Sequence, residues 1–326
     1  MRVLVTGDAG FIGRHLVGGL RAHGHEVIGV DRAPIDDVQP GVTHLRSDLL
    51  DRGHLTEIFA RVAPDAVVHL AARTDLDERR DLSGYAANIA GVENLIAAVS
   101  SCRSIRRAIY TSSQLVCRIG YVPRSDVDYR PTTLYGESKV RTEQIVRASD
   151  GGGVEWCLVR PTLVWGPGMG SHYRRFFRMV AAGRYVHVGH RPLHKSLGYV
   201  GNVVHQYETL LSADAAKMSR RTLYLADYEP VSQRAWADSF QRLLGAPKIR
   251  TVPESLATLA ARAGDLLNAL GWRRFPFNSF RLGNVLTEYV YDLTPARELC
   301  GPLPFTTEDG VAATVQWLRD EGIVGH

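Results

Sequence analysis

The first thirteen residues, MRVLVTGDAGFIG, constrain the fold of this chain more than any other stretch. An apolar run at residues 3–5 is typical of a buried parallel strand, and apolar residues at helical spacing begin at about residue 11. Glycines at positions 7, 10 and 13 separate the two patterns. Such glycines allow a tight turn, close approach of a pyrophosphate to the backbone and close packing of the helix on the sheet. The stretch predicts a dinucleotide site that includes Gly7, Gly10, Phe11, Ile12 and Gly13.

A second apolar stretch, residues 26–30, ends on Asp31, which lies 18 residues after Gly13. An acid at this position of a dinucleotide-binding unit can bond the adenosine ribose hydroxyls. Arg32 follows directly, and an arginine can accept the 2′-phosphate of NADP. Because the Asp31 carboxylate would repel that phosphate, the pair predicts NAD as the cofactor, with NADP as the alternative.

Strand-like and helix-like stretches alternate from residue 2 to about residue 160. This alternation predicts an α/β fold, a Rossmann-like doubly wound parallel sheet that binds its ligand at the carboxyl ends of the strands. Residues 1–165 are the predicted NAD(P)-binding domain, to which residues 197–226 return. Residues 166–196 and 227–326 are the predicted substrate-binding lobe, smaller and mostly helical. One of its helices, at residues 255–270, has an apolar face with two charged residues, which favours a packed helix over a membrane anchor.

The composition is ordinary for a soluble globular protein. The chain has 39 Lys and Arg against 34 Asp and Glu, a formal net charge of +5 without a long basic run. This balance suits an anionic small substrate better than a nucleic-acid surface. No apolar run reaches about 18 residues, and the chain enters a core strand at once, so neither a membrane span nor a signal peptide is expected. Four scattered cysteines are expected as free thiols in the cytoplasm.

Polar or small residues follow several predicted strands, where a cofactor would lie. Asp48 and Leu49 follow the strand at residues 43–46. Asp48 can hold the adenine amine, or it can cap the next helix. Ala71 and Ala72 follow the strand at residues 66–70 and let a cofactor lie against the backbone. His69, within that strand, is expected to be a packed core histidine.

Tyr135 and Lys139 are four residues apart at the start of a predicted helix and therefore share one face. A lysine ammonium favours the phenolate and lowers the tyrosine pKa towards a working value. Ser113, which follows the strand at residues 107–111, can hold the substrate oxygen beside the tyrosine. These three residues predict a catalytic group that moves a proton while a nicotinamide moves a hydride.

Several stretches together resemble the extended short-chain dehydrogenase/reductases, and more narrowly their NAD-dependent epimerase/dehydratase branch. They are TGDAGFIG at 6–13, DL at 48–49, HLAA at 69–72, TSS at 111–113, YGESK at 135–139, and RP at 160–161 with WGP at 165–167. The resemblance implies that Tyr135 is the base, that Lys139 binds the nicotinamide ribose, and that Ser113 contacts a sugar hydroxyl. It implies further cofactor contacts from Leu70, Ala71, Ala72, Thr111, Pro161 and Thr162, and a homodimer.

The same resemblance implies a nucleotide-diphosphate sugar as substrate, with Arg73 and Thr74 bordering it or the nicotinamide. Two departures bear on this. Gln114 follows Ser113 where the sugar-nucleotide 4,6-dehydratases have an acidic pair, which argues against dehydration. Leu163 stands where many sugar-nucleotide epimerases have a diphosphate-binding asparagine, and its loop looks more like that of 3β-hydroxysteroid dehydrogenase and dihydroflavonol reductase relatives.

The sequence thus predicts an NAD(P)-dependent nucleotide-sugar epimerase that works through a keto-sugar intermediate. The alternatives are a keto-sugar reductase, an oxidoreductase acting on a hydrophobic alcohol or ketone, and, last, a cofactor-binding regulator without turnover. Arg174, Arg175 and Arg178 could neutralise a substrate diphosphate or could form a solvated basic face. His187, His190 and His194 lie close in sequence, but the tyrosine chemistry requires no metal and none is predicted.

Overall fold

The computed structural model describes residues 1–34, 39–272 and 277–325, and the chain divides into two compact units. Unit 1 comprises Met1–Trp165, Gly198–Tyr228 and Tyr291–Phe305. Unit 2 comprises Gly166–Leu197, Glu229–Val290 and Thr306–His326. The segment Tyr291–Phe305 thus groups with the sheet, although the sequence prediction counted it with the substrate lobe. That unit 2 binds substrate stays a prediction.

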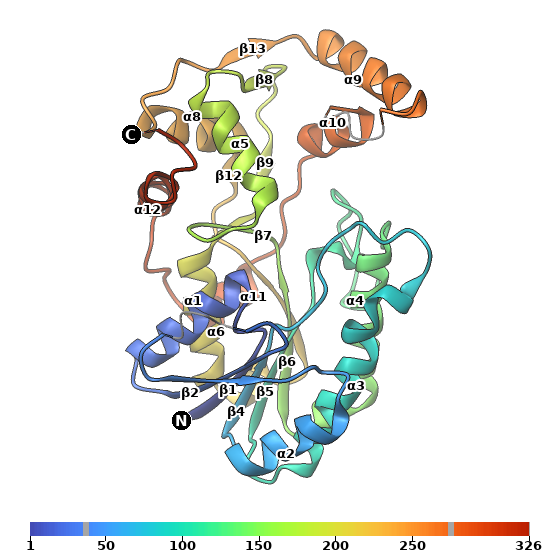
Figure 1. Cartoon of the computed structure of the whole chain (residues 1–326), viewed down its shortest axis with the longest axis vertical. Coiled ribbons are helices and arrows are strands. Elements are labelled where there is room, and N and C mark those ends of the chain that lie inside the picture. Colours follow the sequence, from blue (N-terminus) through green and yellow to red (C-terminus); the bar gives the residue numbers. More distant parts are fainter. Residues whose placement is uncertain (35–38, 273–276, 326) are drawn as a thin grey trace. The chain divides into compact units, whose positions relative to one another are not determined.

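Unit 1 is built on a seven-stranded sheet with the order β11-β6-β5-β4-β1-β2-β3, and its described strand pairs are parallel. The predicted Rossmann-like doubly wound sheet is therefore confirmed (Figure 1). The strands are β1 (Arg2–Thr6), β2 (Glu26–Asp31), β3 (Val42–Arg46), β4 (Ala66–His69), β5 (Arg107–Thr111), β6 (Glu155–Pro161) and β11 (Arg221–Leu225).

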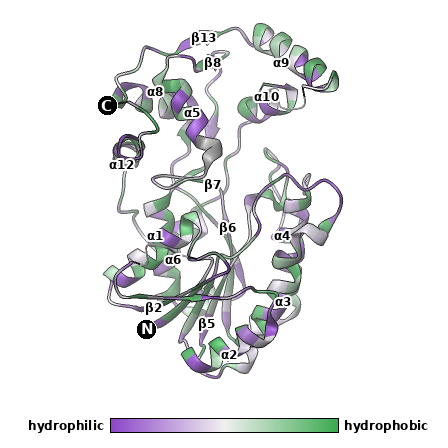
Figure 2. Ribbon diagram, in the orientation of Figure 1, coloured by the Kyte–Doolittle hydropathy of each residue, from purple (hydrophilic) through white to green (hydrophobic). Residues whose placement is uncertain are grey.

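Helices cover both faces of the sheet because successive strand residues point to opposite sides. On β1, Val3 and Val5 join one buried cluster, together with residues of α1 (Phe11–Ala22) and α6 (Val200–Ser212). Leu4 joins the opposite cluster, together with residues of α2 (Arg52–Val62) and α3 (Ala86–Ser101). Figure 2 shows the strands of this sheet in green, as expected for strands buried on both faces.

The remaining elements of unit 1 connect or extend these strands. Its helices are α1 (Phe11–Ala22), α2 (Arg52–Val62), α3 (Ala86–Ser101), α4 (Leu134–Ala148), α6 (Val200–Ser212), α7 (Ala215–Met218) and α11 (Thr294–Cys300). Short 3₁₀ helices are η1 (Leu82–Tyr85), η2 (Gln114–Val116) and η3 (Asp150–Gly152), and β7 (Leu163–Trp165) and β10 (Leu197–Tyr199) form a small separate sheet. Asp51, rather than Asp48, caps the start of α2 by accepting a hydrogen bond from His54 N at 3.0 Å.

Unit 2 has five helices in its described part, α5 (Ser171–Ala181), α8 (Gln233–Leu243), α9 (Glu254–Ala269), α10 (Ser279–Leu286) and α12 (Thr307–Asp320). Short strands pair β13 (Arg250–Val252) with β8 (Val186–Val188), and β12 (Val231–Ser232) with β9 (His194–Lys195). Phe176 and Phe177 of α5 pack on Trp236 and Phe240 of α8, with ring centroids 4.8–6.4 Å apart. Across the described ranges, no helix has the length and apolar character needed to cross a membrane.

Candidate active site

The turn between β1 and α1 has the backbone geometry that a bound pyrophosphate requires. Gly7 has φ +80°, and a Cβ there would stand 2.6 Å from the backbone nitrogen of Ala71. A Cβ at Gly13 would collide with the carbonyl oxygen of Gly7, so the helix can start this close to the strand only without a side chain. The N-cap of α1 is Gly10, and no side chain bonds to the free N–H groups at this helix start. These N–H groups remain available to phosphate oxygens, so the turn fits a dinucleotide.

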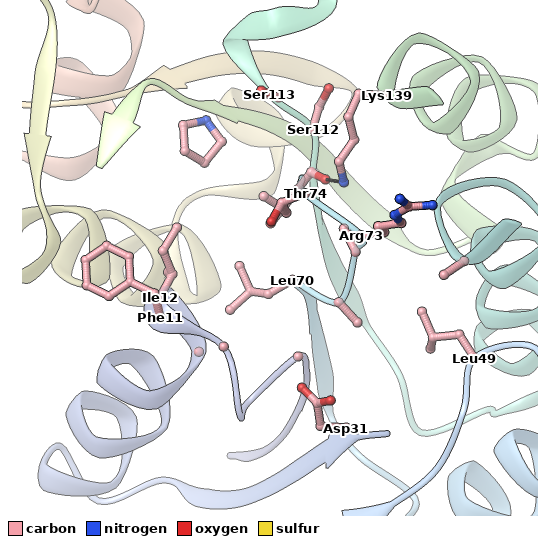
Figure 3. A pocket seen from close by; sticks show the side chains of 18 of the residues that line it. Phe11, Ile12, Asp31, Leu49, Leu70, Arg73, Thr74, Ser112, Ser113 and Lys139 are labelled. Carbon is pink, nitrogen blue, oxygen red and sulfur yellow. Dashed lines mark hydrogen bonds between the residues drawn. The ribbon is translucent and has the colours of Figure 1, made fainter. Parts of the chain in front are cut away.

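A cavity of about 380 Å³ opens next to this turn. Figure 3 shows Asp31 towards one end of it and Ser113 with Lys139 towards the other, with Leu70 between them. The cavity is lined by predicted residues Gly7, Gly10, Phe11, Ile12, Gly13, Asp31, Arg32, Asp48, Leu49, Leu70, Ala71, Ala72, Arg73, Thr74, Thr111, Ser113, Tyr135, Lys139, Pro161 and Thr162. Residues far apart in sequence thus meet along one cavity, as expected at the carboxyl ends of parallel strands.

Four predicted site residues do not line this cavity. Gln114 is buried in η2, and Leu163 belongs to β7, whose next residue, Val164, lines the cavity in its place. Arg174 and Arg175 lie on α5 of unit 2, where the Arg174 guanidinium stacks on Trp317 at 5.6 Å. Sequence reasoning also missed five lining residues: Val30, Ser47, Ala87, Ser112 and Val164. Val30, Ser47 and Ser112 are each next in sequence to a predicted site residue. Their position beside those residues was the signal that could have identified them.

A buried aspartate–histidine pair, Asp8 with His44, lies near Asp31 at the adenosine end of the cavity. The Asp8 carboxylate pairs with His44 Nδ1 at 2.8 Å and fills the space that a Cβ at Gly29 would take. Burial raises the pKa of Asp8, and the charge of Asp31 acts in the same direction, while His44 lowers it. Asp31 is therefore the carboxylate that lines this end of the cavity, whereas Asp8 is buried against His44, and the sequence analysis missed the Asp8–His44 pair.

The three predicted catalytic residues come from two neighbouring elements. Thr133 caps α4 by accepting a hydrogen bond from Gly136 N at 3.0 Å, which sets Tyr135 in the first helical turn. Lys139 follows one turn later, and its Nζ donates to the carbonyl oxygen of Thr111 at 2.9 Å. Ser113 begins η2 and its Oγ accepts from Leu115 N at 3.1 Å. The end of β5 and the start of α4 therefore carry the proton-transfer groups together.

The proton affinities of these groups are set mainly by burial. Burial raises the pKa of Tyr135 to about 12, and the Ser113 hydroxyl acts in the opposite sense. Burial lowers the pKa of Lys139 to about 8, and Glu143 acts against that shift. In the protein without cofactor, desolvation of the phenolate thus outweighs the lowering of the Tyr135 pKa that was expected from Lys139. That an oxidised nicotinamide and Lys139 together lower this pKa stays a prediction. At neutral pH Tyr135 is a neutral phenol, which is a proton donor.

A buried ion pair between Arg160 and Glu143 lies next to the catalytic residues. Arg160 on β6 donates from Nε and Nη2 to the two oxygens of Glu143, each at 2.8 Å, and neither side chain is more than 1% exposed. Ser112 Oγ donates to the same carboxylate at 2.6 Å, and Tyr129 OH at 2.9 Å. Glu143 lies one helical turn after Lys139, so the network ties α4 to the ends of β5 and β6. The sequence marked Arg160 as a motif residue but gave no sign of its partner.

The loop after β4 is held in place by two hydrogen-bonding side chains. Asn88 of α3 accepts from Arg73 N at 2.8 Å and donates to Arg73 O at 2.9 Å, so it clamps both sides of that residue. The Arg73 guanidinium pairs with Asp75 at 2.7 Å and Glu78 at 3.3 Å and donates to Gly84 O at 2.9 Å. The positive charge of Arg73 is therefore already compensated by two carboxylates.

The histidines that the sequence analysis singled out do not line the cavity. His69 is fully buried, shares a 2.7 Å hydrogen bond with Thr6 Oγ1, and burial lowers its pKa to about 3, so it is neutral and packed as predicted. In unit 2, His187 pairs with Asp238 at 2.9 Å and His194 with Glu288 at 3.3 Å. Among the residues described, no group of three ligand side chains could hold a metal ion.

The cofactor preference can be tested at Asp31. Asp31→Asn removes the charge that opposes a 2′-phosphate, so we expect the ratio of NAD affinity to NADP affinity to fall by about tenfold or more, corresponding to about 1.4 kcal/mol. Calorimetric titration with both cofactors measures the ratio. Asp48→Asn is the matched control, because Asp48 also lines the cavity but bonds Leu50 N at 2.9 Å, and there the ratio should hold. An unchanged ratio in Asp31→Asn would mean that Arg32 or Asp8 sets the choice.

Comparison with known proteins agrees with this architecture. A model of the NAD dependent epimerase/dehydratase family matches residues 3–226. The chain is 31% identical to a 3-beta-hydroxysteroid dehydrogenase of Mycolicibacterium neoaurum, over 98% of this chain and 92% of that protein. It is 28% identical to a 2-alkyl-3-oxoalkanoate reductase of Stenotrophomonas maltophilia, over 95% and 97%.

The fold is shared with a crystal structure of UDP-glucose 4-epimerase with UDP-glucose from Thermotoga maritima. The TM-score is 0.76 at 20% identity, with 98% of this chain and 99% of that chain covered. The family model covers more than half of the chain, and the dehydrogenase relative is aligned over 98% of it. These matches confirm the family that the glycine turn and the tyrosine–lysine pair predict. The chain belongs to the NAD dependent epimerase/dehydratase family and is an NAD-dependent enzyme of the extended short-chain dehydrogenase/reductase type.

Proposed function

We propose that this enzyme interconverts a secondary alcohol and a ketone on a largely apolar substrate. The observation that supports the proposal is that both cations lining the cavity near Ser113, Arg73 and Lys139, already have partners within the protein. Arg73, the cation predicted to meet the substrate, is compensated by Asp75 and Glu78. Lys139 is buried and bonded to Thr111 O, where the cofactor ribose is expected. Neither of these cations is available to a substrate diphosphate, and an uncharged ketone needs none.

The neighbouring side chains support the same substrate class. Ala87, Pro161 and Val164 line the cavity and offer no side-chain hydrogen bond. Leu163 likewise cannot donate to a diphosphate, in contrast to an asparagine. Two relatives of comparable length are named for a steroid and for an alkyl-substituted oxoalkanoate. A third, 24% identical over 97% of this chain, is named as an N-acetyl-alpha-D-glucosaminyl-diphospho-ditrans,octacis-undecaprenol 4-epimerase and favours the sugar alternative. This proposal moves the hydrophobic-substrate alternative of the sequence analysis ahead of the nucleotide-sugar epimerase.

The residue roles follow from protonation. NAD, when bound, supplies the hydride chemistry. Tyr135, as a neutral phenol, donates its proton to the ketone oxygen, and Ser113 holds that oxygen through its hydroxyl. Lys139 stabilises the phenolate that remains, provided that it is protonated. Thr111 O holds Lys139 near Tyr135, and the charge of Glu143 favours the protonated form of Lys139. The Gly7–Gly13 turn with Asp31 binds the dinucleotide.

A nucleotide-sugar epimerase is the second candidate function. Its fold-level support is the likeness to UDP-glucose 4-epimerase, which at 20% identity concerns the fold alone. Its support in this chain is basic helix α5, where Arg175 and Arg178 are exposed. Under this reading, Arg175→Gln with Arg178→Gln would raise KM for a nucleotide sugar without changing NAD affinity.

The two functions differ in what happens to the cofactor. We expect continuing, stoichiometric consumption of added NADH when the protein is mixed with a 3-ketosteroid or with an uncharged ester of a 2-alkyl-3-oxo acid. UDP-glucose and UDP-N-acetylglucosamine should remain unchanged by NMR. Net interconversion of a UDP-sugar at constant nicotinamide absorbance would overturn the proposal and establish the epimerase.

The pH dependence should differ between the two directions of the reaction. Reduction needs Tyr135 protonated and Lys139 charged, so kcat/KM for the ketone should be level at neutral pH and fall as pH rises through about 8, where Lys139 loses its proton. Oxidation needs the phenolate, and because burial raises the Tyr135 pKa to about 12, its rate should rise with pH from neutral. Profiles measured in both directions test this. A reduction rate that increases through pH 8 would contradict the assignment of Tyr135 as the proton donor.

A further inference from the structure

Helix α9 of unit 2 packs with its small side chains and exposes its large ones. Its buried positions are Ala257, Ala261 and Gly264, which face a small cluster that includes Leu282 of α10. Leu256, Leu259 and Leu266 of the helix are 58–67% exposed, and Leu270, which caps it, is 73% exposed. We call these four side chains the leucine face. The sequence analysis predicted that the apolar face of this helix is packed. In the structure the face with Ala257, Ala261 and Gly264 is packed, whereas the leucine face is exposed.

The leucine face is one continuous stripe. Positions 256, 259, 266 and 270 fall within about a third of a turn of one another at 100° per residue, Ala263 falls within the same arc, and Ala260 borders it. Trp272 and Phe280, each 68% exposed, follow the helix. Figure 2 shows green, hydrophobic segments along α9. Exposed apolar side chains that gather in a stripe, rather than singly, mark a binding surface.

The charge around this helix indicates what the surface binds. Among the described residues 248–272 and 277–281, the sequence has four Lys and Arg against two Asp and Glu. Unit 2 as a whole has fifteen Lys and Arg against nine Asp and Glu, whereas unit 1 has twenty-four against twenty-five. The positive excess of the chain therefore lies entirely in unit 2. A second copy of the same surface would bring like charges together, whereas an anionic surface complements them.

We propose that the leucine face of α9 docks on the surface of an anionic lipid bilayer. An apolar stripe with Arg262 beside it and the aromatic residues Trp272 and Phe280 after its end resembles a helix that lies in the membrane interface. The helix has 16 residues, too few for the about 20 that a span requires, so it lies on the membrane rather than across it. This goes beyond the proposed function, since it concerns a surface of unit 2 and does not depend on the chemistry at Tyr135.

The test is flotation of the full-length protein with vesicles of phosphatidylcholine, with and without phosphatidylglycerol. We expect binding to the anionic vesicles and weaker binding as salt is raised. The variant Leu259→Gln with Leu266→Gln should lower the partition constant by about tenfold or more, because burying one leucine contributes at least that factor. Val122→Gln is the matched control, because Val122 is 73% exposed but lies in unit 1. NAD affinity, measured by calorimetry, should be unchanged in both variants.

Three results would overturn the proposal. One is failure of the unaltered protein to float with the anionic vesicles. Another is equal binding of the double leucine variant and the unaltered protein. The third is a dimer, seen by analytical ultracentrifugation, that the double variant converts to monomers without loss of vesicle binding, because the leucine face would then be a contact between copies. Failure of the NADH assay would leave this proposal standing, since the flotation measures binding alone.

Discussion

Tyr135→Phe is expected to lower kcat by about 10² to 10⁴ while NAD still binds, which is the range for loss of a general acid or base. The substitution keeps the ring, which lies 6.1 Å from the ring of Tyr85 and is almost fully buried. It removes only the oxygen that exchanges a proton with the substrate. The lost rate should therefore appear in kcat, whereas cofactor affinity, measured by calorimetry, should stay within a few-fold of the unaltered enzyme.

Tyr85→Phe is the matched control for this change. Tyr85 is fully buried beside Tyr135, but its hydroxyl donates to the carbonyl oxygen of Asp75 at 2.7 Å and lies outside the proposed proton path. Its removal should cost some stability and leave kcat within about tenfold. Near-normal turnover in Tyr135→Phe, or an equal loss in the two variants, would show that Tyr135 is not the proton donor.

The fold was predictable because local pattern and long-range packing agree along residues 1–165. Val3 and Val5 face one side of the sheet and Leu4 the other, and the sequence shows this as an unbroken apolar run. The glycine turn was equally readable, since only residues without a Cβ fit at positions 7 and 13. The tyrosine–lysine pair could be recognised because both residues lie on one helical face, and helical spacing is visible in sequence.

What could not be predicted depends on partners distant in the chain. Arg73 was expected to meet a substrate, but Asp75 and Glu78 fold back on it, and no spacing rule foretells that loop. The pKa of Tyr135 was expected to fall, but burial raises it, and the extent of burial depends on residues of several elements. On α9, periodicity identified the apolar stripe correctly but could not say whether it faced the core or solvent.

Glu143→Gln is expected to lower the free energy of unfolding by about 3–5 kcal/mol, the cost of leaving a buried charge without its partner. Glu143 is fully buried and accepts from Arg160, Ser112 and Tyr129, and glutamine cannot accept all of these bonds or balance the guanidinium charge. Urea unfolding followed by circular dichroism measures the change. Glu155→Gln is the control, because the Glu155 side chain is 41% exposed in its pair with Arg107, and exposed pairs contribute only about 0–1 kcal/mol.

A double substitution separates charge pairing from packing at this site. Arg160→Met together with Glu143→Leu replaces the ion pair by apolar side chains of similar size, so no buried charge is left alone. The double variant should therefore be more stable than Glu143→Gln, although it removes more hydrogen bonds. Its kcat should nevertheless fall, because Ser112 and Lys139 would lose the carboxylate that ties α4 to the ends of β5 and β6. If the double variant is less stable than Glu143→Gln, the hydrogen bonds of Ser112 and Tyr129, rather than the buried charge, hold this corner of the site together.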